Sequence, residues 1–147
     1  MIDQRTAAYG ALLLRVSLGV MFLAHGLLKL LVFTPAGTAK FFASLGYPPA
    51  LAYGVIAAEL LGGALLVLGV YARVAALALV PLLIGAAQVH LGNGWVFSAQ
   101  GGGWEFPVFW IAAALVQALI GDGALALRPT PAFGSGSAKA PVAARAF

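Results

Sequence analysis

Ionisable side chains lie inside three of the four long apolar runs of this 147-residue chain. Arg15, His25 and Lys29 fall in the first run, Glu59 in the second, and His90 near the end of the third. A charge at the middle of a bilayer costs on the order of 3 kcal/mol, so each of these groups needs a partner or a function. A carboxylate, an imidazole and an ammonium group at similar depth could bind a polar head group or relay protons.

Helical spacing places Arg15, His25 and Lys29 on one stripe of the first run. At about 1.5 Å of rise per residue, Lys29 lies roughly 4 Å below the outer end of its helix, His25 roughly 10 Å and Glu59 roughly 12 Å. We therefore predict a polar pocket in the outer half of a helical bundle. His25, Lys29 and Glu59 are its candidate catalytic residues.

Four further polar residues are candidates for binding a cofactor in this pocket, namely Arg15, Gln88, His90 and Glu105. His90 and Glu105 are expected close to the outer boundary of the bilayer, with Gln88 slightly deeper. Arg15 is expected well below them, nearer the cytoplasm, where Gln117 of the fourth run lies within reach as a partner.

The same side chains also fit a structural interpretation. Glu59 could neutralise Lys29 or His25 and fix the first helix to the second, because buried charges must be paired. His90 and Glu105 could be hydrated residues at the interface, and Arg15 could pair or extend its guanidinium towards water. For His25, Lys29 and Glu59 the structural and functional interpretations both stay open.

The composition places the chain in a membrane and excludes several function classes. Hydrophobic residues make up 63% and charged residues 8%, whereas soluble domains average roughly 25% charged residues. The chain has no cysteine, which excludes disulfides and thiolate sites. The net charge of +4 is spread along the chain, so we expect no nucleic-acid partner. We predict no haem, because His25 and His90 differ in depth by roughly 9 Å. We also predict no metal, because two histidines lack a supporting ligand spacing.

The apolar runs predict an all-α membrane protein, a bundle of four transmembrane helices over residues of about 8–32, 51–70, 74–91 and 104–121. The first run is expected to be a retained transmembrane helix rather than a cleaved signal peptide. Between the first two helices, the segment TAKFFASL is expected to form a short interfacial helix. Residues 1–128 form the transmembrane domain in this prediction, and residues 129–147 form a flexible cytoplasmic tail.

The basic residues predict how the helices are oriented. With four spans both termini share one side, and that side holds Arg5, Arg73, Arg128, Lys139 and Arg145. The opposite side holds Lys40, together with Lys29 close to a helix end. Because cytoplasmic loops carry an excess of lysine and arginine, both termini are predicted to be cytoplasmic.

Between Leu12 and Leu127 three stretches form a recognisable polar pattern: LLLRVSLGVMFLAHGLLKL in the first run, ASLGYPPALAYGVIAAELLGGALLVLGVYARVAALAL through the second and third, and GGGWEFP before the fourth. This pattern resembles that of the DoxX family. The end of the matched region departs from the family pattern, because Leu127 is followed by Arg128 rather than by an acidic residue.

The resemblance implies a four-helix protein of the bacterial inner membrane. Some members of the family are similar to subunits of quinone-linked enzymes that oxidise thiosulfate, and others accompany membrane redox or stress-response complexes. We therefore expect a subunit of a redox complex whose pocket faces a quinone, with lipid, a redox protein partner and a homo-oligomer as its contacts. The alternatives are a structural or assembly subunit and a small transporter of a solute or of protons.

Overall fold

The computed structural model describes residues 3–131 of the chain, and over these residues its regular structure is helical, with no strand. The α-helices are α1 (Gln4–Leu27), α2 (Pro35–Ser44), α3 (Leu51–Leu68), α4 (Ala72–His90) and α5 (Glu105–Ile120). Helix α1 continues directly into a π-helix, Leu28–Val32, and α4 into a short 3₁₀ turn, Leu91–Asn93. The predicted all-α class is confirmed. The first long helix begins at Gln4, before the predicted residue 8, because Asp3 caps it by accepting a hydrogen bond from the amide of Arg5.

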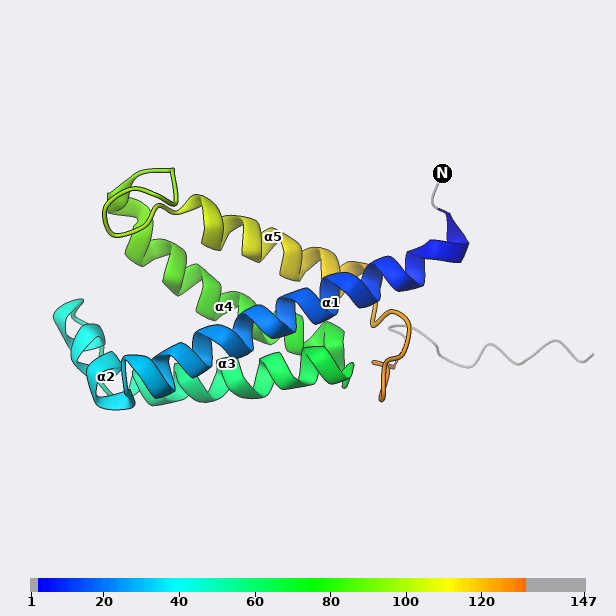
Figure 1. Ribbon diagram of the computed structural model, residues 1–147, viewed down its shortest axis with the longest axis horizontal. Helices are drawn as coiled ribbons and strands as arrows, with labels where there is room; N and C mark the ends of the chain where they lie inside the picture. The colour runs from blue at the N-terminus through cyan, green and yellow to red at the C-terminus, as the bar shows by residue number, and fades with distance from the viewer. Residues whose placement is uncertain (1–2, 132–147) are drawn as a thin grey trace, which may run out of the picture.

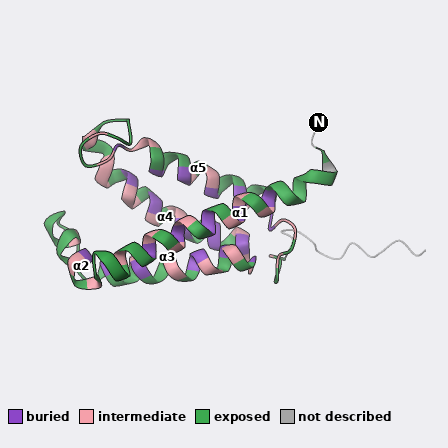
Figure 2. Cartoon of the chain, in the orientation of Figure 1, coloured by how far each residue is buried: buried purple, intermediate pink, exposed green. Residues whose placement is uncertain are grey.

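Three of the helical stretches within residues 3–131 are long and apolar enough to cross a bilayer: Arg5–Val32, Leu51–Leu68 and Ala72–Asn93. Helix α5 is also apolar but shorter. Large hydrophobic side chains cover the outside of all these helices, for example Leu13 and Leu61, whose exposed fractions are 69% and 67%. Figure 2 shows the same exposed surface along the outer sides of the ribbons. A surface of this kind contacts lipid, so the chain is a membrane protein.

The long helices form two closely packed pairs, α1 with α3 and α4 with α5. Gly19 of α1 and Gly63 of α3 allow the first pair to approach closely, because a Cβ at Gly63 would lie 2.9 Å from the carbonyl oxygen of Gly19. Between the pairs lies a core of buried side chains that includes Leu66, Leu83 and Trp110.

A tight turn at Val70 and Tyr71 connects α3 to α4. Helix α3 ends at Gly69, whose φ of 68° is left-handed, and the amide of Val70 donates back to the carbonyl of Leu65 at 2.9 Å. This is the usual glycine-terminated helix end. From this turn α3 and α4 diverge, as Figure 1 shows, so that the two helix pairs enclose a wedge.

The segment after α5 folds back across the narrow end of the wedge. The amide of Tyr71 donates to the carbonyl of Arg128 at 2.8 Å, and the amide of Arg128 donates to the carbonyl of Gly69 at 3.0 Å. The Arg128 guanidinium, at the position where the sequence departs from the family pattern, lies 5.0 Å above the centre of the Tyr71 ring. Most of the predicted flexible tail, residues 132–147, lies outside the described residues.

Candidate functional site

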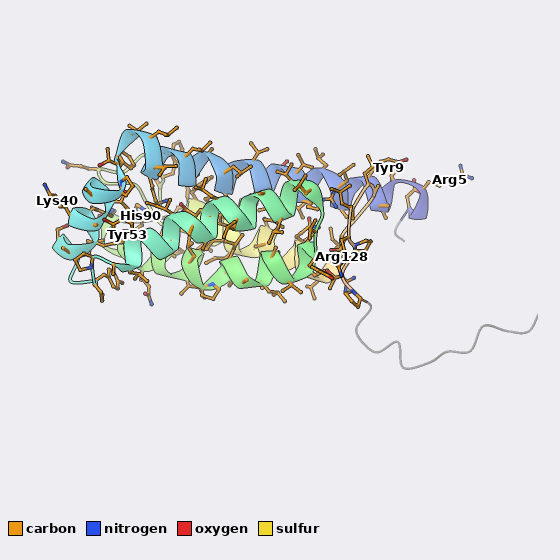
Figure 3. The ribbon with its side chains drawn as sticks, turned by 90° about the horizontal axis from the view of Figure 1, so that it is seen from below. Arg5, Tyr9, Lys40, Tyr53, His90 and Arg128 are labelled. Carbon is orange, nitrogen blue, oxygen red and sulfur yellow. The ribbon has the colours of Figure 1, made fainter. Side chains whose placement is uncertain are left out.

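The predicted site residues lie at two opposite ends of the molecule. Figure 3 shows Lys40, Tyr53 and His90 at one end and Arg5 and Arg128 at the other. We call these the pocket end and the arginine end. Helix α2 and the loop of residues 91–104 belong to the pocket end, where the ribbons of α3 and α4 lie farthest apart (Figure 1).

A change of helix type positions Lys29 at the pocket end. In the π-helix the amide of Phe33 donates to the carbonyl of Leu28 at 3.0 Å, five residues back. The chain then turns at Thr34, whose hydroxyl caps α2 by accepting the amide hydrogen of Gly37 at 3.2 Å. Short π-helical segments occur frequently at functional sites, and this one carries Lys29 at its second position.

Lys29 and Glu59 form an ion pair between the π-helix and α3. The Nζ atom of Lys29 donates to both carboxylate oxygens of Glu59, at 2.7 Å and 2.8 Å. The exposed fraction of the side chain is 22% for Lys29 and 4% for Glu59. Of the two pairings that the sequence allowed for Glu59, the structure has the one with Lys29. One of the three ammonium hydrogens is left for another acceptor.

His25 lies one turn below Lys29 and has a defined ring orientation. Its Nδ1 atom donates to the carbonyl of Met21 at 2.9 Å, because a carbonyl can only accept. In the neutral ring this leaves Nε2 with its lone pair, as an acceptor or a base. The ring meets Trp110 of α5 edge to face, with 4.9 Å between centroids, and lies 6.5 Å from the ring of Phe106.

Trp110 contributes a buried polar group that has no partner among the described residues. The residue is 5% exposed, and its indole Nε1 is buried without a hydrogen bond to any described residue. A buried donor left unpaired costs about 1–3 kcal/mol, so such a group usually has a ligand or water beside it.

These groups line a pocket of about 610 Å³ in the wedge, a size within the range of small-molecule sites. Five of the seven predicted site residues line it: His25, Lys29, Glu59, Gln88 and His90. Aromatic rings from α2, its following loop and α5 and small residues from α3 and α4 make up much of the remaining wall, including Phe41, Phe42, Tyr47, Phe106, Gly54, Ala58 and Gly85. An aromatic and aliphatic wall with a few polar groups suits a mostly apolar ligand with a polar end.

His90 also organises the loop that follows α4. Its Nδ1 atom lies 3.0 Å from the carbonyl oxygens of both Gly101 and Gly102, and Asn93 donates to the same two carbonyls. Glu105 lies outside the pocket, where its carboxylate accepts the amide hydrogen of Phe97 at 2.8 Å. The geometry therefore gives Glu105 a role in closing the loop.

Arg15 is remote from the pocket and is buried at the arginine end, 1% exposed. Its guanidinium donates to the carbonyls of Asp122 at 2.8 Å and of Ala124 at 3.3 Å. The expected pairing with Gln117 is not formed, because Gln117 instead donates to the carbonyl of Gly121 at 2.7 Å. Arg15 thus holds the returning segment.

Asp122 was not singled out by the sequence, yet it is 8% exposed and organises the same segment. Burial raises the pKa of its carboxyl group. Hydrogen bonds from the amide and hydroxyl of Thr130, both at 2.9 Å, and the amides of Arg73 and Ala72 outweigh that effect, so the pKa is lowered overall. The sequence signal was the Gly-Asp-Gly that follows the last apolar run.

The sequence also did not predict that aromatic side chains line the pocket. These side chains, among them Phe42, Phe106 and Trp110, come from elements far apart in the sequence. An aromatic residue in an apolar run is ordinary for a membrane helix, so the only available signal was that Phe106 and Trp110 are four residues apart and share a helix face.

Fold and pocket together define a helical membrane protein with a polar-ended, largely apolar site. Residues 10–92 match the DoxX family, and the chain belongs to that family. It is similar to a protein of Bacillus subtilis (strain 168) named "Putative oxidoreductase CatD", with 37% identity over 121 residues that cover 82% of this chain and 85% of that protein. No solved structure gives a significant match.

Proposed function

We propose that this chain is a membrane subunit of a redox complex and that its pocket binds the head group of a quinone. Membership of the DoxX family and the similarity to a protein named as an oxidoreductase support the redox role. The observation that carries the quinone is a pocket with a largely aromatic and aliphatic wall that brings His25 and the Lys29–Glu59 ion pair together.

These residues fit a quinone ring in three ways. Its carbonyl oxygens accept hydrogen bonds, for which the free ammonium hydrogen of Lys29 is a donor. Its flat face suits aromatic neighbours such as Phe106. Glu59 holds Lys29 in place, and His25 presents Nε2 as a site that takes up or releases a proton.

A bound quinone would supply chemistry in which two electrons and two protons move together. The chain itself would bind the ring, orient it and exchange protons at His25. The described residues include no metal-binding cluster, so we propose a partner protein as the donor or acceptor of the electrons. The reaction in which this partner takes part, with a sulfur compound or as a response to stress, is open to experiment.

We propose four spans in the bacterial inner membrane, with α5 as the fourth. Helix α5 packs along α4, and Trp95 and Trp104 at its start suit an interface. The arginine end, with Arg5, Arg73 and Arg128, would face the cytoplasm together with both termini. The pocket end would then face outwards.

Tryptophan fluorescence tests the quinone site directly. Exchange of Trp95 and Trp104 for Phe leaves Trp110 as the only one of the three tryptophans, and the protein in vesicles is titrated with a short-chain ubiquinone or menaquinone analogue. We expect saturable quenching. In Glu59→Gln the Kd should rise about tenfold or more, which is about 1.4 kcal/mol, because Lys29 loses the group that orients it.

The matched control is Lys40→Gln, which removes a charge at the same end from an exposed residue of α2 outside the pocket. Its Kd should stay within about twofold of the parent protein, since exposed substitutions away from special features have small effects. Quenching that never saturates, or that is equal in the parent and in Glu59→Gln, would contradict the proposed site.

A structural or assembly subunit is the second candidate, and the two-point Lys29–Glu59 ion pair favours it. In that case Glu59→Gln should break up the native complex in mild detergent. If the site binds quinone, the complex should stay intact while turnover is lost.

A further inference from the structure

The wall of the pocket differs on its two long sides. On the side of α1 and α5 it is closed by rings in contact, with centroid distances of 4.5 Å for Phe22–Trp110, 4.9 Å for His25–Trp110 and 5.6 Å for Phe106–Trp110. Phe22 and Trp110 are buried. These ring contacts pack α1 against α5 along this side of the pocket.

The side of α3 and α4 is built from small residues. Gly54 and Ala58 of α3 and Ala78 and Pro81 of α4 line the pocket and are exposed, so the pocket reaches the surface between these helices. A Cβ added at Gly54 or at Gly85 would meet no atom within 4 Å. The two helices diverge from the Val70–Tyr71 turn towards this opening (Figure 1).

The opening faces the hydrocarbon of the bilayer. Large apolar side chains that can only be covered by lipid flank it, namely Leu61 of α3 and Leu77 and Ile84 of α4, which are 67%, 46% and 45% exposed. The end of the pocket that faces water is instead lined by Phe41, Phe42 and Tyr47 of α2 and its following loop.

His25 and the Lys29–Glu59 pair lie on the wall formed by α1, its π-helical extension and the facing side of α3, and the ring of Trp110 packs against the ring of His25. Gln88 and His90 of α4 also line the pocket.

From this arrangement we infer that the ligand is a membrane-dissolved molecule with an apolar tail, and that it enters from the bilayer between α3 and α4. Its polar ring lies at His25 and Trp110, and its tail leaves past Gly54 and Gly85. The inference rests on the proposed function for the identity of the ring and adds the tail and its route. A water-soluble quinone or acid is not the natural ligand on this account.

The test blocks the opening without touching the polar wall. Gly54→Leu with Gly85→Leu places two side chains in the open space, and both positions are helical, so the exchange favours the fold. Gly10→Leu is the matched control, because Gly10 also has no atom within 4 Å of an added Cβ and lies on α1 outside the pocket. The parent protein, the blocked variant and the Gly10→Leu control all carry Trp95→Phe and Trp104→Phe, and all three are studied in phosphatidylcholine vesicles.

Each protein is titrated with two probes that share a ring, 2,3-dimethoxy-5-methylbenzoquinone and the same ring with a ten-carbon tail. Each Kd is compared between proteins for one probe at a time, so that partition into the vesicles cancels. The blocked variant should bind the tailed probe at least about tenfold more weakly. The Kd of the tail-free probe in the blocked variant should lie within about twofold of its Kd in the control, because this probe has no tail that must pass through the opening.

Equal Kd values for the tailed probe in the blocked and control proteins would overturn the inference, and so would an equal loss for both probes. A change of oligomeric state in the blocked variant, with binding unchanged, would overturn it by showing that a second copy of the chain occupies the gap.

If neither probe quenches the unblocked protein, the proposed quinone function fails, and the opening is tested separately. Phosphatidylcholine with brominated tails should then quench Trp110 less in the blocked variant than in Gly10→Leu. Equal quenching would show that lipid tails do not enter between α3 and α4.

Discussion

Removal of either member of the Lys29–Glu59 pair should destabilise the protein more than removal of both. Three variants form the cycle: Lys29→Met, Glu59→Gln and the double exchange. A single exchange leaves one charge without its partner, which costs about 3–5 kcal/mol for a buried pair. When both charges are gone, nothing is left unpaired, and replacement of a whole buried pair is often neutral.

The burial of the two side chains determines which single exchange lowers the free energy of unfolding more. Lys29→Met leaves the carboxylate of Glu59, which is 4% exposed, so its cost should lie near the upper end of that range. Glu59→Gln leaves Lys29, which is 22% exposed and can turn its ammonium group towards water, so its cost should lie near the lower end. A cost of about 3 kcal/mol corresponds to roughly a 150-fold change in the unfolding equilibrium.

The assay is reversible unfolding in mixed micelles by titration with a denaturing detergent, followed by tryptophan fluorescence. Lys40→Met serves as the control and should change the free energy of unfolding by less than about 0.5 kcal/mol. The reasoning is refuted if the two single costs simply add in the double variant, or if each single variant costs no more than Lys40→Met.

The remaining predictions concern the arginine end. Gly69→Ala should cost at least about 1–2 kcal/mol in the same assay, because Gly69 has a left-handed φ of 68° and an added Cβ would collide with the guanidinium of Arg15; Gly85→Ala, in open helix, should cost nothing. Asp122 has a lowered pKa in the folded protein, so its carboxylate contributes stability above the ordinary Asp pKa of about 3.9, and this contribution is lost as the pH falls through the folded pKa. Unfolding measured from pH 7 down to pH 3 should therefore show an acid-side loss that Asp122→Asn lacks, and identical pH profiles would contradict the role of the Thr130 hydrogen bonds.

The sequence could predict the meeting of Lys29 and Glu59 because regular helices convert residue number into depth. Once two apolar runs are antiparallel neighbours, residues at similar depth on facing stripes are within reach. The ion pair at 2.7 Å agrees with that reasoning. The same reasoning could not foresee the π-helix, because LKLLV carries no local signal that separates it from an α-helix.

The partner of Arg15 could not be derived in this way. Depth alone suggested Gln117, but the guanidinium binds carbonyls of the segment that follows α5. That segment turns back because Gly121 and Gly123 have positive φ values of 105° and 74°, which only the tertiary contacts at this end select. Helical periodicity predicts the positions of side chains only within a helix, so it gives no position for the segment that follows α5.

The aromatic side of the pocket could not be predicted from the sequence, for a different reason. Phe22, Phe106 and Trp110 satisfy the apolar pattern wherever they point, so the sequence does not distinguish a side chain facing lipid from one facing a cavity. Only the packing of α1 against α5 shows that these rings close one side of the pocket and leave the other open.

The most direct test of the quinone pocket is the content of the protein as it leaves the membrane. The native protein is purified in mild detergent, and quinone is extracted and quantified per chain by mass spectrometry, beside Glu59→Gln and Lys40→Gln prepared in the same way. We predict close to one quinone per chain in the native protein and in Lys40→Gln, and a clear loss in Glu59→Gln. A native protein without quinone, or equal amounts in all three, would contradict the account.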